Sequence, residues 1–225
     1  MNKVPAYSIR SLIQVYDGKT VLDIPQLDIP SGQVCGVVGP NGSGKTALLS
    51  ILALLRNPVS GAVLLNGNET GAGQRRRLLG RDVTLIHQNP VLFSTTVKKN
   101  VSYGLRALGL PGTEIKARVQ AALECWDLVR LEERQARKLS GGEAQRVVLA
   151  RGLALESPII LLDEPANSLD EAFRPLLIEV LSRANRTRSA TIVIATHELS
   201  FLSSIADRIL WLEQGRIQSC SWEFR

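Results

Sequence analysis

The chain has 225 residues, enough for one domain with a sizeable core or at most two. Hydrophobic residues make up 44% and charged residues 21%, a globular composition that excludes collagen-like, disordered and coiled-coil chains. Lysine and arginine outnumber aspartate and glutamate by 27 to 21, and this net charge of +6 raises nucleic acids, phosphate ligands and anionic membrane surfaces as partners.

The two ends of the chain and its apolar stretches carry no membrane or export signal. The longest apolar stretch, Ala47–Leu55, is far short of the ~20 residues that a membrane span requires. The opening MNKVPAYSIR lacks the apolar region of a secretory signal. The chain ends at Arg225, and we expect no C-terminal regulatory domain. Cys35, Cys125 and Cys220 are odd in number and widely spaced, so we expect reduced, buried thiols.

Short apolar runs alternate with helical patterns along the chain, an order typical of a mostly parallel sheet covered by helices. The runs lack apolar and polar alternation, so we expect strands buried on both faces. A terminal hairpin is predicted over Ile209–Leu212 and Arg216–Ser219. The other predicted strands are Gln33–Val38, Ala62–Asn66, Asp82–His87, Pro158–Leu162 and Ala190–Ala195.

The apolar spacing predicts three helices. One spans Lys45–Leu55 and is apolar on every side, as expected for a helix buried beside a sheet. A second runs from about Glu114 to Asp127, and a third carries Phe173, Leu177 and Ala184 on one face. No convincing strand occurs between Gln88 and Pro158, which indicates a helical insertion there.

A glycine-rich segment after the first of these apolar runs matches the pattern GxxxxGK[ST] at every fixed position. Its glycines permit positive φ angles and turn backbone amides toward an anion at a helix N-terminus. The lysine can reach the β- and γ-phosphates of a nucleotide, and the threonine hydroxyl can ligate Mg²⁺. The segment is Gly39, Pro40, Asn41, Gly42, Ser43, Gly44, Lys45 and Thr46.

Two adjacent carboxylates, Asp163 and Glu164, end the apolar strand Pro158–Leu162. Because successive side chains on a strand point to opposite faces, the two acids cannot do the same work. Asp163 is placed to hold Mg²⁺ and Glu164 to polarise a water for attack on the γ-phosphate. Taken alone, the pair also fits a merely polar strand end.

The stretch LSGGEAQR at residues 139–146 is the most discriminating one. Ser140, Gly141 and Gly142 precede a helix that begins at Glu143, which makes a second helix N-terminus suited to phosphate. With GPNGSGKT and ILLDEP in this order and spacing, the whole chain resembles the ATPase subunit of ATP-binding cassette (ABC) transporters.

The resemblance implies an α/β P-loop NTPase fold of the ABC-ATPase type, with a RecA-like core, an antiparallel β subdomain and a helical subdomain. It implies one domain over residues 1–225, with core and β subdomain at 1–87 and 156–225 and the helical subdomain at about 88–155. It also implies two cofactors, ATP and Mg²⁺. By this resemblance Tyr16 stacks on adenine, Gln88 contacts Mg²⁺ and the attacking water, and His197 senses the γ-phosphate.

The resemblance also implies a head-to-tail dimer of two copies, in which the nucleotide at Gly39–Thr46 of one chain meets Ser140, Gly141, Gly142 and Glu143 of the other, with Asp170 crossing between chains. The chain departs from the usual family sequence at two places. One is the middle of Pro165–Asp170, and the other is Gly152, where the family usually has alanine. Neither departure removes a phosphate contact.

Such ATPases drive transport through separate integral membrane permease subunits, for which Val91–Asn100 is the expected contact, and an extracytoplasmic solute-binding protein is an expected further partner. The stretch from Gln88 to Leu105 is most similar to bacterial and archaeal importers of oxyanions such as tungstate or molybdate. Phosphate, amino-acid and metal transport, including export, stay open. The resemblance implies a cytoplasmic subunit on the inner face of the cell membrane.

A different class, the ABC ATPases of DNA repair and chromosome organisation, separates the two phosphate motifs by long insertions that this chain lacks. With aromatics at only 4%, no stacking platform for single strands is evident, and no nucleic-acid partner is expected. The surplus cations Arg75, Arg76, Arg77, Arg81, Lys98 and Lys99 are instead predicted to approach an anionic membrane face.

Overall fold

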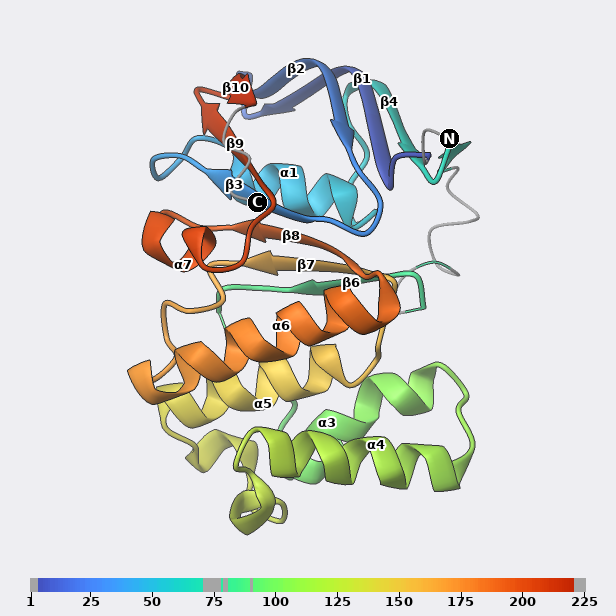
Figure 1. Ribbon diagram of the computed structural model, residues 1–225, viewed down its shortest axis with the longest axis vertical. Helices are drawn as coiled ribbons and strands as arrows, with labels where there is room; N and C mark the ends of the chain where they lie inside the picture. The colour runs from blue at the N-terminus through green and yellow to red at the C-terminus, as the bar shows by residue number, and fades with distance from the viewer. Residues whose placement is uncertain (1–3, 71–77, 79–80, 90, 221–225) are drawn as a thin grey trace.

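The computed structural model describes residues 4–70, 78, 81–89 and 91–220, so the predicted cations Arg75, Arg76 and Arg77 lie outside the described residues. Figure 1 shows an antiparallel sheet at the top and most of the helices at the bottom, with one helix and a mainly parallel sheet between them. The antiparallel sheet has the order β2-β1-β4-β5. Its strands are β1 (Tyr7–Tyr16), β2 (Lys19–Ile29), β4 (Ser60–Leu65) and β5 (Asn68–Glu69).

The second sheet has the order β10-β9-β3-β8-β7-β6. Five of its strands pair in parallel, and β10 returns antiparallel to β9, so the predicted parallel sheet and terminal hairpin are confirmed. The strands are β3 (Val34–Val38), β6 (Val83–Ile86), β7 (Ile159–Asp163), β8 (Thr191–Ala195), β9 (Arg208–Glu213) and β10 (Arg216–Cys220).

The prediction for Ala62–Asn66 is wrong in its sheet. This segment forms most of β4, which pairs antiparallel with β1 in the other sheet. Along β4, buried Val63 and Leu65 alternate with less buried residues, because only one face of this sheet covers the core. A short apolar run is therefore compatible with either sheet, and it does not by itself show which of the two a strand joins.

The helices cover both faces of the parallel sheet. Helix α1 (Lys45–Leu52) lies between the two sheets, and it ends before the predicted Leu55 because Leu54 turns to a φ of 61°. On the other face lie α5 (Gly141–Leu153) and α6 (Arg174–Arg188), followed by α3 (Val97–Ala107) and α4 (Gly112–Cys125). Shorter helices are α7 (Leu199–Ser203) and the 3₁₀ turns Val129–Leu131, Ala136–Lys138 and Glu171–Phe173.

Two hydrophobic cores meet at the parallel sheet. In β7, Ile159 and Leu161 belong to the core shared with α1, whereas Ile160 and Leu162 belong to the core shared with α5 and α6. The expectation of strands buried on both faces is thus confirmed for β7, in which every residue is buried. Packing on both sides holds the carboxyl end of this strand in place.

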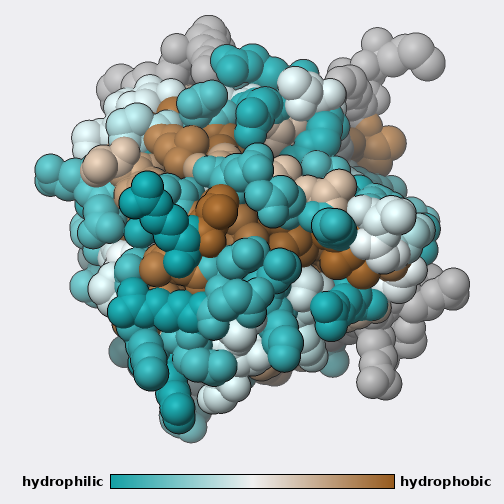
Figure 2. Space-filling view, turned by 90° about the horizontal axis from the view of Figure 1, so that it is seen from below, coloured by the Kyte–Doolittle hydropathy of each residue, from teal (hydrophilic) through white to brown (hydrophobic). Residues whose placement is uncertain are grey.

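Surface and cysteine features complete the fold. Cys35 is buried as expected, Cys125 is only half-buried, and the Cys220 side chain lies outside the described residues. In the described ranges, no helix is both long and apolar enough to cross a membrane. Seen from the helical end, the surface shows a band of hydrophobic side chains between hydrophilic ones (Figure 2).

Candidate nucleotide site

A cavity of about 680 Å³ opens where α1 begins and β7 ends. It gathers residues that are far apart in the chain, from the end of β1 to the carboxyl end of β7. The described residues that line it are Tyr16, Asp17, Val21, Asn41, Gly42, Gly44, Lys45, Thr46, Ala47, Ser50, Arg56, Gln88, Asp163 and Glu164.

The loop between β3 and α1 has the backbone geometry of an anion cradle. Gly44 caps α1 with a φ of 108°, and Gly42 has a φ of 78°, which side chains with a Cβ rarely adopt. At Gly39 a Cβ would overlap the carbonyl oxygen of Leu212. The Ser43 hydroxyl is buried without a hydrogen-bond partner among the described residues. These features leave inward-facing donors at a helix N-terminus, the arrangement that binds phosphate.

Lys45 supplies the positive charge of this loop. It is 7% exposed, and its ammonium donates to the carbonyl oxygens of Gly39 at 2.7 Å and Pro40 at 3.1 Å. Both acceptors belong to the same loop, so the ammonium is held over the cradle. From there its charge can serve the β- and γ-phosphates of a nucleotide.

Thr46 and Asp163 join the start of α1 to the end of β7. The Thr46 hydroxyl donates to Asp163 Oδ2 at 2.8 Å. Burial, with the neighbouring charge of Glu164, raises the pKa of Asp163, although the Thr46 hydrogen bond and the Lys45 charge oppose this. A divalent cation would favour the charged carboxylate, and hydroxyl, carboxylate and amide oxygens are ligands that Mg²⁺ accepts. The donor set of Thr46, Asp163 and Gln88 therefore fits Mg²⁺.

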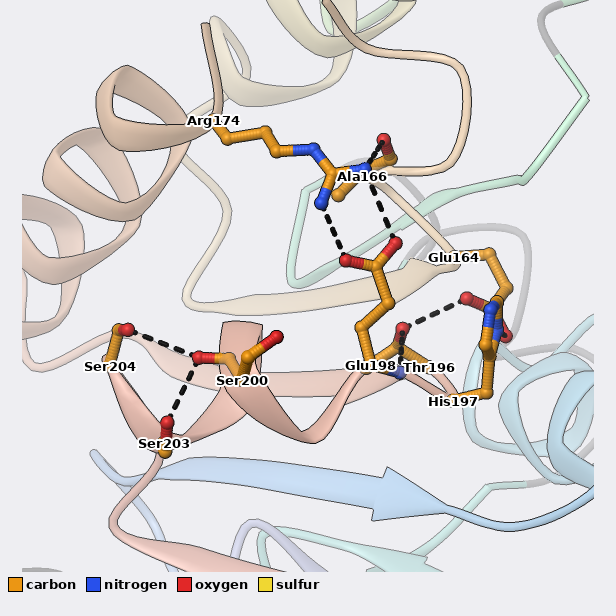
Figure 3. Close-up of polar contacts among 9 residues, drawn as sticks. All are labelled: Glu164, Ala166, Arg174, Thr196, His197, Glu198, Ser200, Ser203 and Ser204. Atoms are coloured by element: carbon orange, nitrogen blue, oxygen red, sulfur yellow. Dashed lines mark hydrogen bonds and ion pairs between the residues drawn. The ribbon is translucent and has the colours of Figure 1, made fainter. Parts of the chain in front are cut away.

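Glu164 follows β7 directly and adopts a left-handed backbone conformation with a φ of 46°. Its backbone N–H donates to the carbonyl oxygen of Ala195 at 2.8 Å. Its buried carboxylate meets the residues that follow β8 (Figure 3). Oε1 lies 2.9 Å from His197 Nδ1, and Oε2 lies 2.9 Å from the Thr196 hydroxyl. The His197 side chain is 54% exposed against 7% for Glu164, so the imidazole forms the outer edge of the site.

The LSGGEAQR stretch builds the N-terminus of α5. Ser140 accepts from the Glu143 N–H at 3.2 Å, and the Glu143 carboxylate accepts from the Ser140 N–H at 2.7 Å. This reciprocal cap lowers the pKa of Glu143 and engages its carboxylate within its own helix. A Cβ at Gly142 would lie 2.6 Å from Asp170 Oδ2, so the loop after Glu164 reaches this helix end.

The structure groups the predicted site residues in two places. Tyr16, Gln88, Asp163, Glu164 and most of Gly39–Thr46 line one cavity, and His197 joins them through Glu164. Ser140, Gly141, Gly142 and Glu143 gather with Asp170 and are not among the described residues that line the cavity. Their predicted contact with nucleotide stays a prediction, because it involves a second chain.

The sequence-based prediction missed Asp17, Val21, Ala47, Ser50 and Arg56. Ala47 follows Gly44 by three residues and Ser50 follows Thr46 by four, a helical spacing that gave a signal for both. Arg56 gave none, although its guanidinium lies 5.2 Å from the centre of the Tyr16 ring, within cation–π range. It covers the ring that is predicted to stack on adenine.

Comparison with known proteins agrees with this geometry. Residues 22–167 match the family model described as ABC transporter. The chain is 35% identical over 210 residues to a tungstate uptake system ATP-binding protein of Peptoclostridium acidaminophilum, covering 93% of this chain and 95% of that protein. It is 34% identical over 210 residues to an Fe(3+) ions import ATP-binding protein of Escherichia coli strain K12, covering 93% of this chain but only 60% of that protein.

A solved structure shows the same fold. The dimeric ATP-binding cassette MJ0796, in a post-hydrolysis state bound to ADP and Pi, superimposes with a TM-score of 0.90 at 26% identity, covering 97% of this chain and 99% of that one. Fold and cavity together define a P-loop ATPase. The chain belongs to the ABC transporter family and is an ATPase domain of that family.

Proposed function

We propose that this chain is the ATP-hydrolysing subunit of an importer whose membrane subunits are separate chains. The cavity carries this proposal, because it unites the phosphate loop, a cation-binding pair and a buried carboxylate at one strand end. Within it, Lys45 binds the β- and γ-phosphates, while Tyr16 stacks on the base. When bound, Mg²⁺ would neutralise phosphate charge from its place at Thr46, Asp163 and Gln88.

Glu164 is the proposed general base, and His197 and Gln88 complete the reacting end of the site. A buried carboxylate held by two hydrogen bonds can accept a proton from water aligned with the γ-phosphate. Gln88 reaches the cavity from the end of β6, where its amide can hold that water. His197 lies at the exposed edge, as a sensor of the γ-phosphate requires.

A second copy is the proposed partner that completes each site. Ser140, Gly141 and Gly142 lie at a helix N-terminus away from the cavity of their own chain, so their amides are available to the nucleotide of another chain. The dimeric form of the cassette MJ0796 supports this arrangement. The proposed division is a core with β subdomain at 1–87 and 156–225 and a helical subdomain at about 88–155.

Substitution of Glu164 by Gln tests the assignment of the base. The change removes the proton acceptor but keeps shape and size, so we expect ATP binding to persist and phosphate release to fall about 100-fold or more. Gel filtration with ATP should then show a trapped dimer. Undiminished phosphate release in this variant would contradict the role of Glu164.

Substitution of Lys45 by Ala is the matched variant for binding. Loss of the ammonium over the cradle should weaken ATP binding about 10-fold or more, since hydrogen bonds to charged groups contribute ~1.5–3 kcal/mol. A titration with a fluorescent ATP analogue measures this. Equal affinity in the two forms would contradict the role of the phosphate loop.

The segment Val91–Asn100 is the proposed docking site for the permease, and Tyr103 of α3 lies beside it. Val91 is 72%, Phe93 43% and Tyr103 55% exposed, an uncommon density of exposed apolar side chains. The Phe93 and Tyr103 rings lie 4.2 Å apart, and Arg151 donates to the Val91 carbonyl at 2.8 Å beneath them. A membrane protein that co-purifies with the tagged chain but not with a Phe93→Asp variant would support this site.

For the cargo we propose a tungstate- or molybdate-type oxyanion, supported by the relative matched over 95% of its length. Iron, phosphate and amino acids are the competing cargoes, and export is the competing direction. The proposed location is the inner face of the cell membrane, beside the permease and an extracytoplasmic solute-binding protein. Uptake of labelled tungstate by proteoliposomes holding the purified complex tests this, and uptake of iron alone would overturn it.

A further inference from the structure

Thr196 occupies the position directly behind the Glu164 carboxylate. It follows β8, is 2% exposed, and is anchored by its own N–H to the Val37 carbonyl at 3.1 Å. Its hydroxyl lies 2.9 Å from Glu164 Oε2 and 3.1 Å from the Glu198 N–H (Figure 3). The hydroxyl thus stands between a carboxylate and a backbone donor.

The direction of these two hydrogen bonds is fixed by chemistry. A hydroxyl has one proton to donate, and a backbone N–H can only donate. The Glu198 N–H therefore takes an acceptor lone pair of the hydroxyl, and the single proton points to Glu164 Oε2. With Oε1 beside His197, both oxygens of the carboxylate have a defined partner, and its plane is set.

Glu198 is itself held from the opposite side. Its carboxylate forms a two-point ion pair with Arg174, at 2.6 and 3.4 Å, and Arg174 also lies 3.4 Å from the carbonyl of Ala166. Ala166 belongs to the loop that follows Glu164. The contacts run from the start of α6 through Glu198 and Thr196 back to Glu164 (Figure 3).

We propose that Thr196 is a positioning residue for hydrolysis: its hydroxyl, oriented by the Glu198 N–H, aligns the Glu164 carboxylate with the attacking water. The proposal rests on the proposed function of Glu164 as base. Alignment matters only while water attacks the γ-phosphate, so loss of the hydroxyl should lower kcat and leave ATP binding in place.

Three single variants of the full chain test this. Thr196→Val keeps the shape but removes the hydroxyl, Thr196→Ser keeps the hydroxyl, and Thr191→Val is the matched control. Thr191 lies at the other end of β8, is 3% exposed, and accepts from the Gly32 N–H at 2.9 Å. Phosphate release gives kcat and KM, a fluorescent ATP analogue gives affinity, and thermal melting gives stability.

We expect kcat of Thr196→Val to fall about 10- to 100-fold with KM and affinity within about twofold of the wild type. Thr196→Ser should retain at least about a third of wild-type kcat. The control should also lose stability, since each valine leaves a half-buried N–H without its hydroxyl acceptor, yet keep its kcat. If Thr196→Val does not fold, Thr196→Ala removes the same hydroxyl in a smaller side chain.

Wild-type kcat in Thr196→Val, or equal losses in the valine and serine variants, would overturn the proposal. An equal loss of kcat in Thr191→Val would also overturn it, because the effect would then follow stability. The proposed function fails separately, if the wild type releases no phosphate or if Glu164→Gln turns over normally.

Discussion

Burial disfavours the charged form of the Asp163 carboxyl group. Its carboxyl group is buried beside the buried Glu164, and its pKa is raised. The folded chain therefore holds a proton there more tightly than the unfolded chain. This contribution to stability is present at low pH and is lost as pH rises from the ordinary carboxyl range through the raised pKa.

Replacing Asp163 by Asn should stabilise the chain at pH 7 when no nucleotide or Mg²⁺ is present, by about 0.5–2 kcal/mol, because the charge is gone and the amide oxygen can still accept from Thr46. Urea unfolding at pH 7 measures this. The control is Asp28→Asn, where the partner Arg10 lowers the carboxyl pKa and no stabilisation is expected. Lower stability of Asp163→Asn than of the wild type would contradict the argument.

Gly152 lies at a helix position where the family usually has alanine, and the packing of α5 explains the glycine. It lies inside α5, where glycine costs up to ~1 kcal/mol relative to alanine. A Cβ at this position would come within 2.6 Å of Ile86 Cδ1 and 2.7 Å of Cγ1. Ile86 is itself buried at the end of β6, so the glycine allows α5 to pack closely on that strand.

Substitution of Gly152 by Ala should therefore destabilise the chain by about 1 kcal/mol, since overpacking a core costs ~1–3 kcal/mol and outweighs the gain in helix propensity. Gly112→Ala is the control, because Gly112 starts α4 with no neighbouring atom among the described residues within 4 Å of a Cβ. Denaturant unfolding of both variants gives the comparison. Greater stability for Gly152→Ala would show that Ile86 yields without cost.

Local sequence pattern predicts some helices and strands of this fold better than others. Strands β3, β7 and β8 are unbroken apolar runs, and α4 has a regular face, so local pattern sufficed. β1 and β2 were not predicted because they alternate irregularly around turns and a bulge, and their pairing is a tertiary property. Likewise, only the register of β4 with β1 shows which sheet it joins.

At the scale of the whole molecule, motif spacing predicted the chemistry of the site better than its surroundings. Lys45, Asp163 and Glu164 sit in fixed patterns, and the structure brings them to one cavity. Arg56 and Thr196 are identified as site residues only by contacts across the fold. Arg56 contacts Tyr16, and Thr196 contacts Glu164. Neither belongs to a spacing that a single sequence reveals, because side-chain distance across elements is set by packing.

The short loop Pro165–Asp170 connects the proposed catalytic base Glu164 to the N-terminus of α5. It leaves Glu164 at one end, and six residues later Asp170 lies against Gly142 at the N-terminus of α5. In the proposed dimer that helix end serves the nucleotide of the other chain. Nucleotide in one site then contacts a helix end that lies against Asp170, six residues along the chain from the base of the other site, so the two sites should act cooperatively.

Phosphate release should accordingly rise sigmoidally with ATP concentration, with a Hill coefficient between about 1 and 2 for two coupled sites. A steady-state titration of the wild type measures the curve, and Asp170→Ala should flatten it toward a hyperbola. A hyperbolic curve for both the wild type and Asp170→Ala would mean that the two sites hydrolyse ATP independently. If the curve is sigmoidal, the six-residue loop Pro165–Asp170 couples the hydrolysis of the two ATP molecules in the dimer.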